Sequence, residues 1–273
     1  MERQELISVI VVTYNSEKTI LYTLHSITEQ TYKNIEIVVS DDCSKDKTLE
    51  FVQSYAQTHG NVFIVPGVKN CGVPANINKG IRAAHGRFFR IIAGDDLLEP
   101  SAIEVYWKNY EENVILISDF TPFGDKDEKK MSKLKDYFSQ MHFFYDLSQK
   151  KQKKILAKYL PICTPGMGLL NLGLLERVGW FTEKYRYMED YPFFLKCVNN
   201  GISFRYLNEK LVKYRISKDS LSGSFNKKSY TSSRQFFFEE RSKYLLKNLQ
   251  IAAFIKNIEY YMKYDILIKF DKV

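Results

Sequence analysis

Cysteine and histidine are scarce in this chain of 273 residues, and their scarcity excludes several kinds of site. The four cysteines, Cys43, Cys71, Cys163 and Cys197, lack the CxxC spacing of a metal site or redox pair. We therefore expect reduced and mostly packed thiols. The four histidines form no Ser-His-Asp or Cys-His pattern, which argues against covalent nucleophilic catalysis.

Long apolar runs and phosphate-binding loops are also missing. No apolar run is long enough to span a bilayer and no signal segment precedes the first predicted strand, so we expect a cytoplasmic protein. Neither GxxxxGK[ST] nor GxGxxG follows that strand, and Gly166-Met167-Gly168 lies outside any leading βαβ unit. A nucleotidyltransferase would carry a glycine-rich, basic loop where this chain has Val12-Thr13-Tyr14-Asn15.

The composition is that of a globular protein with an excess of positive charge. Apolar residues make up 45% and charged residues 26% of the chain, and the formal net charge is +8. Residues 126–158 are rich in lysine, and the C-terminal stretch mixes basic and aromatic residues. This balance suits an anionic membrane surface or an anionic substrate. No nucleic-acid-binding motif accompanies it, so we expect no nucleic acid partner.

Strands and helices alternate in the first part of the chain, which predicts an α/β fold with a parallel, doubly wound sheet. Continuous β-branched runs indicate strands that are buried on both faces. The expected strands are 6–13, 35–40, 62–65, 88–92 and 114–120. Four helices are expected. The first spans 19–27, the second is capped by Ser44 or Asp46 and ends near residue 58, the third spans 74–84, and the fourth begins at Pro100.

The alternation stops after Pro122, where no Gly/Ser/Pro tract marks a linker, so we expect two halves of one domain. We divide the chain into residues 1–122, 123–225 and 226–273, the last being a helical C-terminal extension. Residues 169–175 could pair with the sheet edge. A helix within 183–199 ends at Asn200-Gly201. Two short strands, 203–207 and 211–216, and an amphipathic helical region from Lys227 follow.

Three acidic pairs stand out: Asp41-Asp42, Asp95-Asp96 and Glu189-Asp190. The first two follow parallel strands and therefore meet at the sheet edge where open α/β sheets bind ligands. Adjacent carboxylates repel each other unless a cation neutralises them, and they suit Mg²⁺ or Mn²⁺ shared with a diphosphate. Asp41-Asp42 could instead serve capping and turn formation. Glu189-Asp190 could favour the positive end of a helix, or supply a general base.

With these residues in place, the chain resembles the family 2 glycosyltransferases of the GT-A fold, which are inverting and depend on nucleotide sugars. The resemblance runs from about Leu6 to Ser222, and its pieces follow in the family's order. They are residues 8–15, residues 39–48, Asn70-Cys71-Gly72, Asn76, Gly80, Gly86, Gly94-Asp95-Asp96, Glu189-Asp190, Tyr214-Arg215 and Ser220-Leu221-Ser222.

The resemblance implies a role for each matching position. Residues 1–122 would bind the nucleotide sugar and residues 123–225 the acceptor. Asp190 would be the catalytic base and Glu189 would orient it or the acceptor, while Asp96 would bind Mn²⁺ or Mg²⁺. The residues that would bind the donor are Thr13, Tyr14, Asn15, Asp42, Asn76, Lys79 and Asp95. Lys79 could equally be a solvated helix residue.

The function implied is transfer of a sugar, typically a hexose, from a nucleoside-diphosphate sugar to a saccharide or lipid-linked saccharide, in surface polysaccharide or glycolipid synthesis. The resemblance favours UDP over other nucleotides, because UDP-sugars are the usual donors in this family. A nucleotide-sugar-binding or membrane-associated partner that has lost turnover is the alternative. Two departures affect the expected site. Ala75 stands where many relatives have arginine, and Ser217 where some have histidine.

The C-terminal extension lies outside the resemblance. Its basic and aromatic residues could form an amphipathic helix on the inner face of an anionic membrane. They could equally cover the catalytic domain or form a homodimer.

Overall fold

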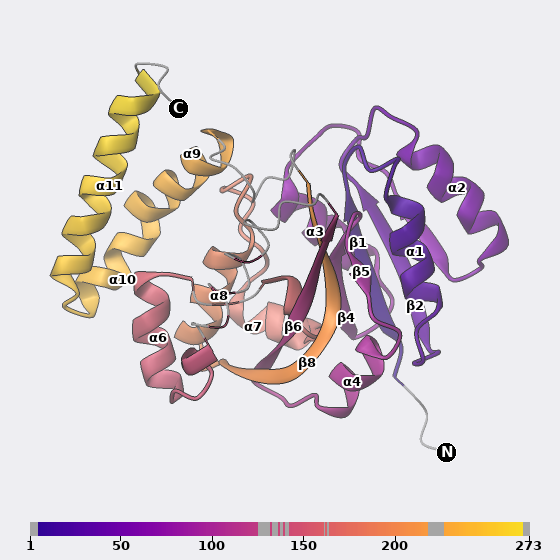
Figure 1. Ribbon diagram of the computed structural model, residues 1–273, viewed down its shortest axis with the longest axis horizontal. Coiled ribbons are helices and arrows are strands. Elements are labelled where there is room, and N and C mark those ends of the chain that lie inside the picture. Colours follow the sequence, from indigo (N-terminus) through magenta and orange to yellow (C-terminus); the bar gives the residue numbers. More distant parts are fainter. Residues whose placement is uncertain are drawn as a thin grey trace.

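The computed structural model describes residues 5–124, 142–160, 162, 164–217 and 227–269, together with residues 132, 136 and 139. Most of the lysine-rich stretch before residue 142, and Ser220-Leu221-Ser222, lie outside these residues. Figure 1 shows a sheet with helices on both sides, a second sheet beside it, and a group of helices at the C-terminal end. The predicted α/β fold, with a mostly parallel central sheet and a helical C-terminal extension, is therefore confirmed.

The central sheet consists of β1 (Ile7–Thr13), β2 (Ile35–Asp41), β3 (Val62–Val65), β4 (Phe88–Ala93) and β7 (Leu170–Asn171). Its strand order is β3-β2-β1-β4-β7, and only β7 is antiparallel to its neighbour. β1 and β2 are almost entirely buried, which explains why their sequences are continuous apolar runs. Because β1, β2 and β4 are parallel, their C-terminal ends meet at one edge.

The helices of this half are α1 (Ile20–Thr28), α2 (Thr48–Thr58), α3 (Val73–Ala83) and α4 (Ala102–Lys108). In Figure 1, α1 and α2 lie on one side of the central sheet and α3 on the other. Asp46 takes the expected place before α2, where its Oδ1 accepts a hydrogen bond from the Thr48 N–H at 3.0 Å. Before α3, Gly72 has a left-handed backbone with φ of 91°, which glycine adopts without strain.

A second sheet contains β5 (Leu97–Leu98), β6 (Val114–Gly124) and β8 (Ser203–Ile216), with β8 in the middle. The expected strand 114–120 thus forms as part of β6, but it pairs with β8 in the second sheet and does not join the central sheet. The prediction of two short strands over 203–216 was wrong, because these residues form the single strand β8. Residues 208–210 are exposed and lie at a register shift beside Asp119, so a bulge accommodates them without ending the strand.

Between β6 and β8 in the sequence, the structure describes the α-helices α6 (Gln149–Lys158), α7 (Leu172–Val178) and α8 (Asp190–Asn199). Residues 169–175 pair with the sheet edge as expected, but only through β7. Asn171 is the last residue of that strand and the N-cap of α7. Its side-chain oxygen accepts a hydrogen bond from the Leu174 N–H at 2.8 Å, which satisfies a free N–H at the start of the helix. The helix expected within 183–199 is α8, and it ends before Gly201, whose φ is 83°.

The C-terminal extension contains α9 (Lys227–Phe236), a π-helical turn (Phe237–Arg241), α10 (Ser242–Lys247) and α11 (Ile251–Lys269). Its aromatic residues largely face inward: Tyr230, Phe237 and Tyr261 form a buried cluster with Leu245 and with Ala157 of α6. Within the described part of the chain, no helix combines the length and the apolar character that crossing a bilayer requires.

Candidate functional site

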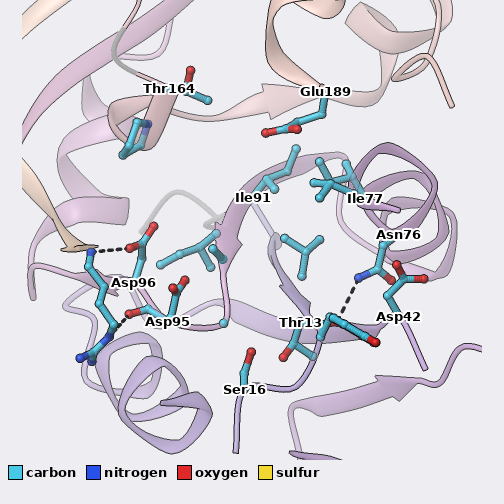
Figure 2. Close-up of a pocket in the computed structure, with 18 of the residues that line it drawn as sticks. Thr13, Ser16, Asp42, Asn76, Ile77, Ile91, Asp95, Asp96, Thr164 and Glu189 are labelled. Atoms are coloured by element: carbon cyan, nitrogen blue, oxygen red, sulfur yellow. Dashed lines mark hydrogen bonds between the residues drawn. The ribbon is translucent and has the colours of Figure 1, made fainter. Parts of the chain in front are cut away.

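A cavity of about 1580 Å³ opens over the C-terminal edge of the central sheet (Figure 2). It lies where β1, β2 and β4 end, which is the usual position of ligands in open α/β sheets. The predicted site residues that line it are Thr13, Tyr14, Asn15, Asp42, Asn76, Asp95, Asp96, Glu189 and Asp190. Lys79 is not among the residues that line it. The fold thus brings acidic residues from distant segments into one space.

Asp95 and Asp96 lie in the turn that follows β4. The turn requires a glycine at its start, because a Cβ atom on Gly94 would lie 2.9 Å from Oγ1 of Thr13. Arg215 of β8 holds the turn from the other side. Its backbone N–H donates to Oδ1 of Asp96 at 2.8 Å, and its Nε donates to the carbonyl oxygen of Asp95 at 2.9 Å. The second sheet therefore positions both aspartates (Figure 2).

The environment of this pair favours a bound cation. Burial raises the pKa of Asp96 to about 8, and the negative charge of Asp95 is the second cause. Burial also raises the pKa of Asp95, while the Arg215 guanidinium opposes that shift. A divalent cation would offset the repulsion between the two carboxylates. Because Mg²⁺ sites often use one or two carboxylates and complete their shell with water and substrate phosphates, the pair fits such an ion.

The described residues contain no group of three or more His, Cys, Asp and Glu side chains that could hold a metal ion. Substrate oxygens and water could supply further ligands to an ion at Asp95 and Asp96. This is the expected arrangement for an ion that arrives with a diphosphate.

Asp42 and Asn76 lie on the β2 side of the cavity (Figure 2). The Asp42 carboxylate accepts the backbone N–H of Cys71 at 2.7 Å and of Gly72 at 2.8 Å. Asn76 donates from Nδ2 to the carbonyl oxygen of Ser40 at 2.7 Å. Both side chains therefore secure the backbone around the cavity. Since each carboxylate oxygen has further acceptor capacity, Asp42 can also accept a hydrogen bond from a ligand.

The turn after β1 contributes three neighbouring residues. Oγ1 of Thr13 is buried and has no hydrogen-bond partner among the described residues, although it belongs to a residue that lines the cavity. Such a hydroxyl is suited to bind a ligand. Asn15 has a left-handed backbone with φ of 53°, and its Oδ1 accepts the Lys45 N–H at 2.8 Å. Tyr14 is 48% exposed, so its ring is accessible beside these polar groups.

Lys79 lies on α3, beneath the Asp41-Asp42 turn. Its Nζ donates to the carbonyl oxygen of Asp41 at 2.6 Å. Burial lowers the pKa of Lys79, and the charges of Asp42 and Asp41 act in the opposite direction. Its ammonium group therefore supports the turn that carries Asp42.

Glu189 lies across the cavity from Asp95 and Asp96 (Figure 2). Asp190 follows it as the first residue of α8 and also lines the cavity. Oδ2 of Asp190 accepts a hydrogen bond from the Thr164 hydroxyl at 2.8 Å. Burial raises the pKa of Asp190. It also raises that of Glu189 to about 8, with the Asp190 charge as the second cause. A carboxylate with a raised pKa is a stronger base than an exposed one.

Arg186 is a cavity residue that the sequence-based prediction missed. Its Nη2 donates to the carbonyl oxygen of Asn70 at 2.6 Å, which joins the loop before Glu189 to the loop that binds Asp42. A Cβ atom on Gly72 would lie only 2.3 Å from Cγ of Arg186. The glycine in the loop was a signal of close approach, but the sequence does not indicate which residue approaches.

The C-terminal extension also contacts the segment before Glu189, through Tyr185, which is next to the cavity residue Arg186. The Tyr185 hydroxyl donates to Oε1 of Glu240 at 2.8 Å and contacts Oε2 of Glu239 at 3.1 Å. The ring of Phe236 packs against Tyr185 and Tyr191, with ring centroids 5.3 and 5.4 Å apart. These contacts flank Glu189 and Asp190 on both sides, so the extension supports the segment that carries them.

Comparison with known proteins identifies the family. The model of the family described as Glycosyl transferase family 2 matches residues 8–179. A glycosyltransferase of Methanocaldococcus jannaschii, itself named as uncharacterized, is 29% identical over 225 residues, which are 77% of this chain and 71% of the relative. One from Haemophilus influenzae is 28% identical over 252 residues, 90% of this chain and 76% of the relative.

Solved structures agree on the fold. TarS of S. aureus, in its complex with UDP-GlcNAc, superposes with a TM-score of 0.64 at 20% identity, covering 88% of this chain and 66% of that one. The mannosyltransferase PcManGT of Pyrobaculum calidifontis, in complex with GDP-Man and Mn²⁺, superposes with a TM-score of 0.59 at 20% identity. The match covers 91% of this chain and 65% of that one. At these identities the likeness shows the fold alone. With the family match extending from β1 through α7, the chain belongs to glycosyl transferase family 2 and is a glycosyltransferase.

Proposed function

We propose that this glycosyltransferase moves a sugar, with inversion, from a nucleoside-diphosphate sugar to a hydroxyl group of a saccharide or lipid-linked saccharide. UDP-hexoses are the first donors to test. The observation that carries the proposal is that two acidic pairs, Asp95-Asp96 and Glu189-Asp190, line one cavity, with Glu189 across from Asp95 and Asp96 (Figure 2). One wall suits a cation and a diphosphate, and the other suits a base.

The donor would occupy the side of the cavity formed by the ends of β1 and β2. Asp42 has the capacity to accept a hydrogen bond from a base imide or a ribose hydroxyl. The Thr13 hydroxyl, which has no hydrogen-bond partner in the described part of the chain, and the accessible ring of Tyr14 line the same side. The ligands in the structural neighbours, UDP-GlcNAc and GDP-Man, support a donor of this chemical class.

Asp95 and Asp96 would hold Mn²⁺ or Mg²⁺ together with the diphosphate. A bound divalent cation supplies charge neutralisation for a departing nucleoside diphosphate. The Mn²⁺ in the PcManGT structure supports the choice of ion. Arg215 keeps both aspartates in place through its two hydrogen bonds to their turn.

Asp190 would act as the base, and Thr164 and Glu189 would orient and tune it. The acceptor oxygen forms a bond to the anomeric carbon while the bond from that carbon to the diphosphate oxygen breaks. The proton of the acceptor hydroxyl passes to the Asp190 carboxylate. Because the attack comes from the face opposite the leaving diphosphate, the anomeric configuration inverts. Burial, which raises the pKa of Asp190, favours this proton transfer.

The experiment compares Asp190→Asn with Asp96→Asn, since each asparagine retains one side-chain oxygen acceptor. Donor binding is measured as a thermal shift over a nucleotide-sugar panel with Mn²⁺, because a bound ligand raises the apparent stability. Asp190→Asn should retain the shift and lose turnover by about 100-fold or more. Asp96→Asn should lose the Mn²⁺-dependent part of the shift.

Full turnover in Asp190→Asn would remove this residue from the mechanism. A wild-type chain that binds donors but transfers no sugar to any acceptor would favour the alternative, a nucleotide-sugar-binding partner without turnover. Surface polysaccharide or glycolipid synthesis at the inner face of the membrane is the setting in which we place the reaction.

A further inference from the structure

Helix α6 is strongly basic on its exposed side. It contains no acidic residue and five lysines: Lys150, Lys151, Lys153, Lys154 and Lys158. Lys153 is half-buried and the other four are exposed. None of the ion pairs of the described residues includes any of the five. The opposite side of the helix is fixed in the protein through the buried residues Gln152, Leu156 and Ala157.

Exposed apolar side chains lie directly beside this basic helix, in and around the turn between α10 and α11. Leu249 is 85% exposed, Leu246 43% and Ile251 47%. The turn is held on α6 because Nε2 of Gln250 donates to the carbonyl oxygen of Lys154 at 3.0 Å. Figure 1 shows α6 next to the junction of α10 and α11.

Exposed apolar side chains also follow that turn along α11. Ile255 is 49% exposed and Met262 60%, and with Ile251 they recur at helical spacing on one face. The exposed lysines Lys243 and Lys247 flank it on α10. We call the whole surface the basic-apolar edge, and its members are Lys150, Lys151, Lys154, Lys158, Lys243, Lys247, Leu246, Leu249, Ile251, Ile255 and Met262.

The basic-apolar edge is connected to the cavity by the chain itself. Two residues after the last residue of α6, Leu160 lines the cavity, and Ile162 and Thr164 line it as well. Thr164 donates to Asp190, the proposed base. The edge therefore adjoins the wall at which the acceptor would be deprotonated.

We propose that the basic-apolar edge docks the enzyme on an anionic lipid surface. Its leucine, isoleucine and methionine side chains enter the interfacial region, and its lysines contact the lipid headgroups. Exposed apolar residues bordered by lysine are the pattern of helices that lie in a membrane interface. Four aromatic residues of the extension, Tyr230, Phe236, Phe237 and Tyr261, are buried, whereas Phe238 is 42% and Tyr260 47% exposed. The members of the edge itself are aliphatic and basic.

Two other occupants fit the edge less well. A second copy of the chain, related by a two-fold axis, would bring two surfaces of the same positive charge together, and these repel each other. A nucleic acid would neutralise the lysines but would leave the five apolar side chains in water. The lipid surface satisfies both kinds of side chain.

The test is sedimentation of the full chain with vesicles of pure phosphatidylcholine and with vesicles that also contain phosphatidylglycerol. We expect binding to the anionic vesicles, weakened by salt because salt screens exposed charges. Lys151→Gln with Lys154→Gln should lower the partition coefficient about 30-fold, since each lysine near an anionic surface is worth about 1 kcal/mol. Lys33→Gln with Lys210→Gln, which removes the same charge elsewhere, should change it less than twofold.

The apolar part of the edge is tested with Leu249→Asn. Leu249 has a left-handed backbone with φ of 55°, which asparagine tolerates well, so the turn should persist. We expect a drop of about tenfold in binding to anionic vesicles, because a side chain as large as leucine no longer enters the interface. Val68→Asn, at a position that is 97% exposed in the loop after β3, is the matched control.

Equal binding to both kinds of vesicle, or binding to neither, would overturn the proposal. So would self-association that the lysine substitutions abolish in the absence of lipid, or tighter binding to duplex DNA than to the anionic vesicles. The role of docking in catalysis rests on the proposed function, but the vesicle-binding measurement is independent of that function. Loss of vesicle binding with a normal donor-induced thermal shift affects only the edge, and absence of that shift in the wild type affects only the proposed function.

Discussion

The carboxylates in the cavity differ in what stabilises them. Asp42 accepts hydrogen bonds from two backbone N–H groups, those of Cys71 and Gly72. Asp96 accepts one from Arg215 but lies beside Asp95 and is 6% exposed. Glu189 has Asp190 as its charged neighbour, and burial is the main cause of its raised pKa. One edge of a sheet thus contains a carboxylate suited to hydrogen bonding and two pairs that favour a cation or a proton.

The raised pKa of Glu189 predicts a pH-dependent stability. Its pKa is about 8 in the folded chain and 4.5 for an ordinary glutamate. Between these values the folded chain keeps a proton that the unfolded chain releases, so the free energy of unfolding decreases as the pH rises. Glu189→Gln removes this contribution. At pH 8 and without ligands, the variant should be more stable than the wild type by at least about 1 kcal/mol, the equivalent of one pKa unit.

Urea denaturation at pH 4.5 and pH 8 measures the effect, and the difference between variant and wild type should be smallest at pH 4.5. Glu104→Gln is the control. Hydrogen bonds from Lys108 and Thr31 lower the pKa of Glu104, so its contribution to the free energy of unfolding changes with pH in the opposite direction. If Glu189→Gln has the same relative stability at both pH values, Glu189 is ionised in the folded chain.

Among the elements, α3 depends on close contact with the central sheet. A Cβ atom on Gly80 would lie 2.5 Å from Cγ2 of Ile10 and 3.0 Å from Cβ of Ser40. The glycine therefore lets α3, which carries Asn76, approach β1 and β2. In this way the packing of one helix sets the position of a cavity residue.

Gly80→Ala should lower the free energy of unfolding by about 1–3 kcal/mol, the usual effect of overpacking. The sign is informative, because alanine in an exposed helix position would instead stabilise by about 1 kcal/mol. Gly60→Ala is the matched control, since a Cβ atom there would have no neighbour within 4 Å. Chemical denaturation of both variants checks the prediction, and an equally stable Gly80→Ala would show that α3 can move away from the sheet.

At the scale of the whole molecule, the helices beyond residue 226 support the wall that carries Glu189 and Asp190. The link is specific, because the Tyr185 hydroxyl lies within hydrogen-bond distance of both Glu239 and Glu240. The family match ends at residue 179, so this support comes from a segment that the family model does not cover. The extension therefore joins two tasks, contact with the cavity wall and the proposed contact with lipid.

Tyr185→Phe should lower kcat about 3- to 10-fold, because one lost hydrogen bond corresponds to about 1 kcal/mol. The donor-induced thermal shift should be unchanged, since Tyr185 supports the acceptor wall and not the donor side. Tyr22→Phe, at a residue that is 65% exposed on α1, is the control. A parallel loss of donor binding would indicate a general loosening of the fold.

Much of the fold could be predicted because its signals are local. β3 has the expected bounds, and α2 and α3 begin and end within about two residues of expectation. The placement of β6 could not be predicted, since a buried apolar strand carries no mark of the sheet it joins. The interruption at residues 208–210 was misread for a related reason: only pairing with β6 shows that a bulge replaces a turn.

The sequence by itself determined which edge of the sheet carries the cavity and that Asp42 meets Asp95-Asp96 there. Parallel strands align their C-terminal ends, so residues that follow them, such as Asp42 and Asp96, meet without further information. The tertiary structure alone decided which side chains complete the walls, including Arg186 against Asn70 and Lys79 against Asp41. It also decided that four aromatic residues of the extension turn inward and leave the lysines of α6 exposed. These outcomes depend on contacts between distant segments, whose free energies are set by packing and not by local pattern.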